Sequence, residues 1–186
     1  DITDIRRLAP AVENCAYFQT SGFSPKPEPV IEEMIRWMRF QNQGPAIGWV
    51  AQEMERMFEA AHARVAGALG AEPAEIMLNE NTTVGITIVA TGIDWRAGDN
   101  VILSTHEHPG NRMVWYQIAK HHGVELRFLP ISNDTTTLLE KFEALLDART
   151  RVISISHVSR ESGLRLPARQ SVEIAHRHNA PIIFDG

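Results

Sequence analysis

Several features that would assign a protein to a broad class are scarce or absent in this chain of 186 residues. It holds a single cysteine, Cys15, so no disulfide can form within the chain, and we expect a reducing, cytoplasmic setting. Basic residues are interspersed with acidic ones, the net charge is −5, and no Lys/Arg cluster offers a phosphate-backbone footprint, so we expect no nucleic acid partner. No run of about 18 apolar residues predicts a membrane span.

The chain also shows no secretory signal pattern, no initiator methionine and no C-terminal tail, which leads us to expect a trimmed or partial chain. What is present is typical of a globular protein. Hydrophobic residues make up 44% of the sequence and charged residues 22%, a balance that can bury a sizeable core.

Two helices dominate the expected structure of the first 70 residues. Residues 1–25 are predicted to be irregular, with a short extended piece at Ala16–Gln19. Apolar residues at three- and four-residue spacing then predict helices over 27–41 and 47–69, and Gly70 is a suitable end for the second.

From about residue 75 the sequence predicts strands that alternate with helices. This alternation is typical of βαβ units, so we expect an α/β fold with a mostly parallel sheet covered by helices on both faces. The near-continuous apolar strands agree with burial on both sides. The predicted strands are Glu75–Leu78, Asn100–Thr105, Val124–Pro130, Arg151–Ser156 and Pro181–Asp185, and the predicted helices are Thr83–Thr91, Pro109–His122, 136–146 and 168–178.

Ligands of open α/β sheets bind beyond the carboxyl ends of the strands, so we examine the residues that follow each strand. After the first comes "NENTTVG", where Asn81, Thr82 and Thr83 open a helix. The free amide groups of a helix N-terminus bind phosphate readily, although an ordinary N-cap has the same sequence. A nicotinamide-binding fold is not indicated, because G-x-G-x-x-G is absent here.

The second strand is followed by "THEHPGN", in which Pro109 suits the first turn of a helix and His108 falls near its N-cap. A metal site formed by His106, Glu107 and His108 is the alternative, but adjacent residues of a turn point apart and no fourth ligand is evident. We therefore expect no metal, and expect His108 to stack on a flat ligand or to move protons.

Two further strand ends carry polar residues. "SHVSRESG" places His157, Ser159 and Arg160 after the fourth strand, where a plain polar loop is the alternative. Asp185 ends the last strand, and a carboxylate there needs a cationic or hydrogen-bonding partner that no neighbouring Lys or Arg supplies. An anion site, an imidazole and this carboxylate together match pyridoxal phosphate, whose ring nitrogen typically pairs with an Asp.

At this point the sequence resembles the class V aminotransferase group of fold-type I pyridoxal-phosphate enzymes, and most of all the cysteine desulfurases and the cyst(e)ine carbon–sulfur lyases. The matching stretches follow the family order over nearly the whole chain. They are "YFQTSGFSP", "NENTTVGITIVATGIDWRAGDNVILSTHEHPGN", "SHVSRESGLRLP" and "PIIFDG".

The resemblance implies a role for each matching position. Thr83 and the backbone of Thr82 would bind the cofactor phosphate, His108 would stack on the ring and act as acid or base, and Asp185 would pair with the ring nitrogen. The turn at Ser21–Gly22 would lie near the substrate. It also implies that 1–25 joins a small domain, that 26–186 is the first part of the cofactor-binding large domain, and that the protein is a homodimer.

The sequence also departs from the family pattern. Arg160 stands where desulfurases commonly have an Asn that contacts the ring oxygen, so Arg160 either takes over a cofactor contact, meets a substrate carboxylate or faces solvent. The Schiff-base lysine, the substrate-binding arginine and the desulfurase cysteine would all lie beyond residue 186, and Cys15 matches none of them.

The expected function is therefore pyridoxal-phosphate-dependent cleavage of a carbon–sulfur bond in cysteine or cystine, by a desulfurase or a lyase, with this stretch alone inactive. Two alternatives remain open: a class V aminotransferase or amino-acid epimerase acting on another substrate, and a non-catalytic fragment that binds phosphate or a partner. A cysteine on a mobile loop in the remaining sequence would favour a desulfurase.

Overall fold

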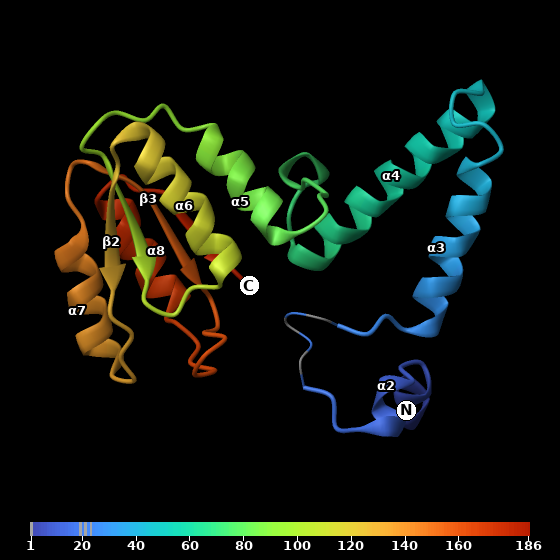
Figure 1. The fold of residues 1–186 in the computed structure, drawn as a ribbon, viewed down its shortest axis with the longest axis horizontal. Coiled ribbons are helices and arrows are strands. Elements are labelled where there is room, and N and C mark those ends of the chain that lie inside the picture. Colours follow the sequence, from blue (N-terminus) through green and yellow to red (C-terminus); the bar gives the residue numbers. More distant parts are fainter. Residues whose placement is uncertain (1, 19, 21, 23) are drawn as a thin grey trace. The chain divides into compact units, whose positions relative to one another are not determined.

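The chain forms two compact units that divide between Leu78 and Asn79. The computed structural model describes residues 2–18, 20, 22 and 24–186 (Figure 1). The division predicted from the resemblance, at residue 25, concerns the domains of a whole family member and stays a prediction.

The first unit is helical. The predicted helices over 27–41 and 47–69 are confirmed, and the second ends at Gly70, whose left-handed backbone (φ 68°) closes it as expected. Residues 1–25 were expected to be irregular, and this is wrong for two short helices that have too few turns to give a periodic pattern. The helices are α1 (Ile2–Arg7), α2 (Ala11–Asn14), α3 (Glu28–Gln41) and α4 (Gly48–Leu69), followed by the 3₁₀ turn η1 (Pro73–Glu75).

Two predicted extended segments do not form strands. Glu75–Leu78 begins inside η1 and continues without a strand partner among the described residues, because Pro73 and the Glu72–Glu75 capping box favour a helical turn. Ala16–Phe18 likewise lie outside any strand, and Gln19 falls outside the described residues.

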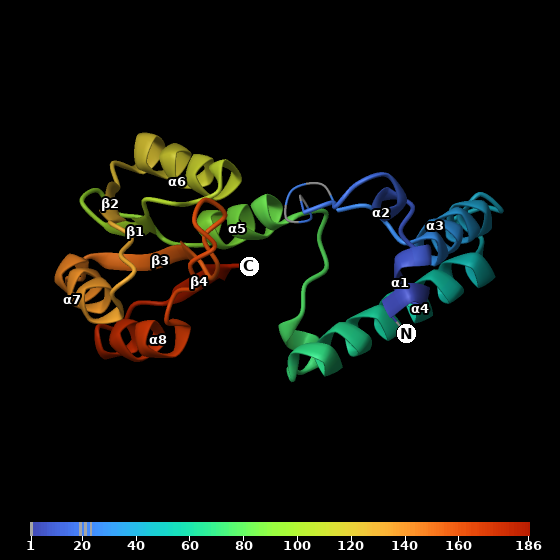
Figure 2. The same cartoon turned by 90° about the horizontal axis from the view of Figure 1, so that it is seen from below.

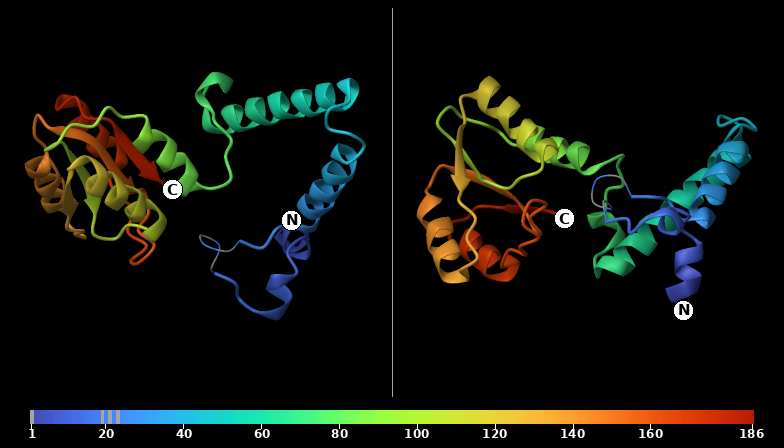
Figure 3. Two further views of the ribbon diagram at one scale, coloured as in Figure 1. Left: turned by 45° about the horizontal axis from the view of Figure 1, so that its top comes forward. Right: turned by 60° about the horizontal axis from the view of Figure 1, so that its bottom comes forward.

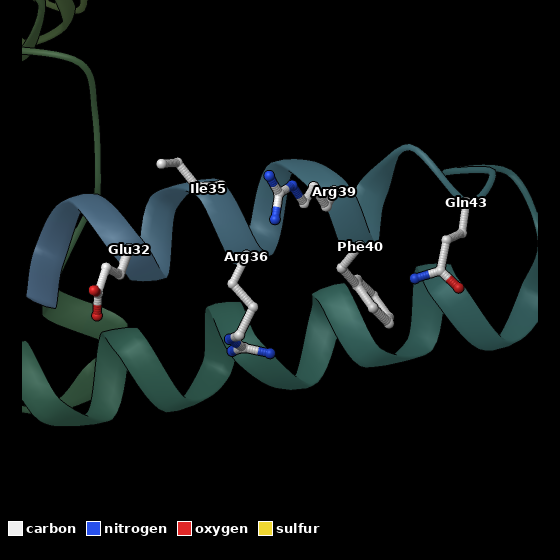
Figure 4. Close-up of a pocket in the computed structure, with 6 residues that line it drawn as sticks. All are labelled: Glu32, Ile35, Arg36, Arg39, Phe40 and Gln43. Carbon is white, nitrogen blue, oxygen red and sulfur yellow. The ribbon is translucent and has the colours of Figure 1, made fainter.

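An aromatic contact joins α3 to its neighbour α4. The ring of Phe40 packs edge-on against Trp37 and Trp49, with centroids 5.3 and 5.7 Å away. In the shallow hollow along α3, Arg36 and Phe40 point toward α4, whereas Ile35 points away (Figure 4). Arg36 is bound to Glu33 at 2.6 Å, so this hollow holds a charge pair that is already satisfied.

The second unit is the predicted α/β sheet. Its four strands are all parallel, in the order β2-β1-β3-β4, and each predicted boundary in this unit agrees with the structure to within one residue. The elements are α5 (Thr82–Thr91), β1 (Asn100–Ser104), α6 (Pro109–His122), β2 (Glu125–Leu129), α7 (Thr135–Leu145), β3 (Thr150–Ser156), α8 (Ala168–Arg177) and β4 (Ile182–Asp185).

Helices cover both faces of this sheet, as predicted. Figure 2 shows α5 and α6 on one side and α7 and α8 on the other. Successive strand residues point to opposite faces, so Val101 and Leu103 pack with Trp115 of α6, whereas Ile102 packs with Phe142 of α7. The sheet is therefore held between two apolar layers, which fixes the positions of its strand ends.

No helix in the described ranges combines the length and apolarity that crossing a membrane requires.

We predict that Phe142→Ala lowers the free energy of unfolding by about 3–5 kcal/mol, because it leaves a cavity in the layer between the sheet and α7. Phe142 is 1% exposed. The matched control is Lys141→Ala on the exposed side of the same helix, which should change stability by less than about 0.5 kcal/mol. Urea unfolding of the intact protein measures both, and equal effects would contradict the two-layer core.

Candidate functional site at the carboxyl ends of the strands

The candidate site lies where the strand order reverses within the parallel sheet. From β1 the chain moves outward to β2, whereas β3 and β4 lie on the other side of β1, so the loops after β1 and β3 diverge from a common point. Such a switch point is the usual ligand position in open α/β sheets. Figures 1, 2 and 3 agree in placing the N-termini of α5 and α6 beside the end of β4.

The first component is the N-terminus of α5. The side chain of Asn81 caps it by accepting a hydrogen bond from the amide of Val84 at 3.0 Å. The amides of Thr82 and Thr83 donate to no acceptor in the described part of the chain, and both residues are exposed. Two free N–H groups, a hydroxyl and the positive end of the helix dipole can therefore receive an anion.

The second component is His108, the N-cap of α6. Its Nδ1 atom accepts a hydrogen bond from the amide of Gly110 at 3.0 Å, so the neutral ring carries its proton on Nε2. A Cβ atom placed at Gly110 would collide with the hydroxyl of Thr83 and lie 3.0 Å from Nδ1 of His108. The imidazole and the N-terminus of α5 are thus neighbours, as the sequence predicted.

The third component is Asp185 at the tip of β4, opposite Ser156 in the sheet register. Its side chain is half-buried, and the hydrogen bonds and ion pairs of the described residues leave its carboxylate without a partner. Burial raises the pKa of Asp185, the charge of Glu107 raises it further, and His108 acts in the opposite direction. A half-buried carboxylate without a partner can accept a cation or a hydrogen-bond donor at this position.

The loop after β3 adds a fourth component. Ser159 is buried, and its hydroxyl accepts hydrogen bonds from the amides of Glu161 and Ser162 at 3.2 Å while it contacts Nδ1 of His106 at 3.2 Å. These contacts fold the loop back on the end of β1. Arg160 is exposed on this loop and has no ionic partner among the described residues, so its guanidinium is available to a ligand.

The structure adds a residue that the sequence suggested only as a metal ligand. Glu107 is 1% exposed and lies between the ends of β1 and β3, where it accepts hydrogen bonds from Ser104, Ser156 and Asn111. The described residues contain no cluster suited to a metal ion. The only sequence signals for this arrangement are serines at two strand ends and an Asn four residues after the Glu.

The predicted substrate-proximal turn belongs to the first unit, whereas the residues described above belong to the second. Ser21 lies outside the described residues, and Gly22 is an exposed turn residue of the first unit. Their role stays a prediction.

We predict that Asp185→Asn does not destabilise the cofactor-free protein at pH 7 and raises its melting temperature. The raised pKa means that the folded state binds this proton more tightly than the unfolded chain does, so the ionised carboxylate costs stability at pH 7. The gain should vanish as the pH falls below about 3.9, the ordinary Asp pKa, where the wild type is protonated in both states.

Asp134→Asn is the control, and thermal denaturation should show the opposite change in its melting temperature. Hydrogen bonds from Thr137 to Asp134, the N-cap of α7, lower its pKa, so losing the charge there should lower the melting temperature at pH 7. A lower melting temperature for Asp185→Asn at pH 7 would contradict the unpartnered state of Asp185.

Curated proteins with similar sequences are cysteine desulfurases. The chain is 32% identical to the enzyme of Cronobacter sakazakii over 179 residues and 33% identical to that of Escherichia coli O139:H28 over 180 residues. Each alignment covers 92% of this chain and 44% of the relative, so the chain spans less than half the length of the curated relatives it matches.

Solved structures of similar fold include two of the cystine C–S lyase C-DES. One is a variant with glycine covalently linked to its pyridoxal phosphate cofactor, with a TM-score of 0.88 and 26% identity over 97% of this chain and 49% of that one. The other is a complex with cysteine persulfide, its reaction product, with a TM-score of 0.88 and 25% identity over 95% and 48% of the two chains.

The family model for class-V aminotransferases matches residues 16–186, which include the whole sheet and every component of the site described above. The chain therefore belongs to the class-V aminotransferase family.

Proposed function

We propose that the intact protein uses pyridoxal phosphate to cleave a carbon–sulfur bond of cysteine or cystine. The observation that carries this proposal is the convergence of the α5 N-terminus, His108 and the unpartnered Asp185 at one edge of the sheet. The similarity to cysteine desulfurases and to a cystine C–S lyase supports the sulfur-containing substrate.

The residues at this edge fit the cofactor in chemistry as well as in position. The free amides of Thr82 and Thr83 and the Thr83 hydroxyl match a phosphate. Because Gly110 has no side chain, the Thr83 hydroxyl can lie beside it; a Cβ atom there would collide with that hydroxyl. Asp185 offers a carboxylate whose negative charge a protonated ring nitrogen would offset.

When bound, pyridoxal phosphate withdraws electrons from the substrate through its protonated ring. Asp185 would hold the proton on the ring nitrogen, and its partial burial strengthens that contact because fewer water molecules compete for the charge. His108 would face the ring and exchange a proton through Nε2, the atom left free by the bond between Nδ1 and Gly110.

Arg160 would bind the carboxylate of the amino-acid substrate. It is exposed, it follows the same strand end that carries Ser156, and the described residues leave its guanidinium without an ionic partner. A bidentate contact with a carboxylate suits this group. A contact with the cofactor ring oxygen is the second role that its position allows.

A class-V aminotransferase or epimerase acting on another amino acid would use the same cofactor contacts, so it is the alternative for the reaction. We also propose a homodimer in the cytoplasm, which the family resemblance and the single, exposed Cys15 support.

We predict that the intact protein shows a visible absorption band of bound cofactor that changes when cysteine is added. Sulfide with pyruvate identifies a lyase, whereas alanine in place of pyruvate identifies a desulfurase. A band that does not respond to cysteine or cystine would reject these substrates while retaining the cofactor. Protein that shows no band after incubation with pyridoxal phosphate would contradict the proposed function.

We also predict that Thr83→Ala weakens pyridoxal phosphate binding about tenfold, the loss expected for one hydrogen bond to a charged group. Binding of pyridoxal, which lacks the phosphate, should change by less than about twofold. Thr91→Ala is the matched control, because Thr91 is an exposed threonine at the opposite end of α5. Equal losses for both ligands would show that Thr83 does not bind the phosphate.

A further inference from the structure

We propose that Glu107 is a positioning residue of this site, whose buried negative charge ties the ends of β1 and β3 to α6 and reinforces Asp185 in holding a cationic ring. This inference rests on the proposed function. The hydrogen bonds of Glu107 reach neither the N-terminus of α5 nor Asp185.

Glu107 is surrounded by hydrogen-bond donors. One carboxylate oxygen accepts from the amide of Ser104 at 3.3 Å, from the hydroxyl of Ser104 and from the amide of Ser156 at 3.0 Å. The other accepts from Asn111 Nδ2 at 2.7 Å and from the hydroxyl of Ser156 at 2.9 Å. An ionised carboxylate, which only accepts, satisfies all of these groups at once.

The orientation of the Asn111 amide is fixed independently of Glu107. Its Oδ1 atom lies 2.9 Å from Nε1 of the fully buried Trp115 and 2.8 Å from the hydroxyl of Ser154. Because an indole nitrogen can only donate, the oxygen of Asn111 must face Trp115 and its NH₂ group must face Glu107. The core on the α6 side of the sheet thus requires an acceptor at position 107.

This network fixes the turn that presents His108. The hydroxyl of Ser104 donates to Glu107 and accepts from the amide of His106 at 3.2 Å, so the chain between β1 and α6 is held at both ends. His108 follows Glu107 directly and caps α6, the helix that Asn111 anchors. The imidazole position is therefore set by groups buried beneath it.

Glu107 also acts on Asp185 through its charge. In the described residues Glu107 forms no ion pair, so its charge is offset by dipoles alone. Ser156, which donates two hydrogen bonds to Glu107, lies opposite Asp185 in the sheet register, and the charge of Glu107 raises the pKa of Asp185. The two carboxylates repel each other when no cation is bound, and both attract a cation placed at Asp185. A ligand with a protonated ring nitrogen gains from both charges, whereas a neutral ring gains from neither.

The test compares two ligands in the intact protein after its own cofactor has been removed. One is pyridoxal phosphate, and the other is its analogue with CH in place of the ring nitrogen, which cannot carry the ring charge. Dissociation constants are measured by equilibrium dialysis for the wild type, Glu107→Gln, Glu107→Asp and the exposed-site control Glu173→Gln on α8.

We expect Glu107→Gln to weaken pyridoxal phosphate binding about tenfold and to leave analogue binding within about twofold of the wild type. Glu107→Asp keeps the charge and should restore most of the difference, and Glu173→Gln should change neither constant. Equal losses for both ligands in Glu107→Gln would reduce Glu107 to a structural residue and overturn the inference.

Glu107→Gln places an NH₂ group against the NH₂ group of Asn111, which could prevent folding. The double variant Glu107→Gln with Asn111→Asp avoids this, because the new carboxylate at position 111 accepts from the side-chain amide of the new glutamine at position 107. The Ser156 hydroxyl then accepts from that amide in place of donating, and the charge moves from residue 107 to its neighbour 111. Its preference for pyridoxal phosphate over the analogue should stay within about twofold of the wild type, and a tenfold fall would overturn the role of the charge. Wild-type protein that binds neither ligand would instead reject the proposed function.

Discussion

The parallel pairing of β1 with β3 is the constraint on which the rest of this structure depends. It places Ser104 and Ser156 at the same edge and brings two amides and two hydroxyls within reach of one buried carboxylate, that of Glu107. The helices that follow the two strands then leave this point in different directions. A site at the edge results from strand direction alone, and the buried network gives it a defined shape.

The same arrangement sets stability against function. Asp185 and Glu107 are two carboxylates at one end of the sheet, and the charge of Glu107 raises the pKa of Asp185, so the ionised form of Asp185 is less favourable in the absence of a cation. The apolar layers on both faces of the sheet supply the stability that allows this repulsion. Asn in place of Asp185 would remove this repulsion, and it would bind the protonated ring of the proposed cofactor less tightly.

Much of the fold and part of the site could be predicted from the sequence. Continuous apolar strands with helices between them predicted the parallel sheet of the second unit. Asn81 and Pro109 marked the N-termini of α5 and α6, where the proposed anion site and His108 lie. Strand 75–78 was predicted wrongly because local composition cannot show whether a partner strand exists. The Glu107 network was missed because two of its donors belong to Ser156, 49 residues away, and are adjacent only once the sheet has formed.

Gly110 shows how closely the two helix ends must approach for the site to exist. No positive φ requires glycine there; the requirement comes from the Thr83 hydroxyl, which occupies the space that a Cβ atom would fill. The amide of Gly110 also donates to His108, so this one residue contacts the imidazole and lies beside the Thr83 hydroxyl at the N-terminus of α5. Moving either helix outward to admit a side chain would separate the imidazole from the N-terminus of α5, so the packing of α5 against α6 sets the geometry of the candidate site.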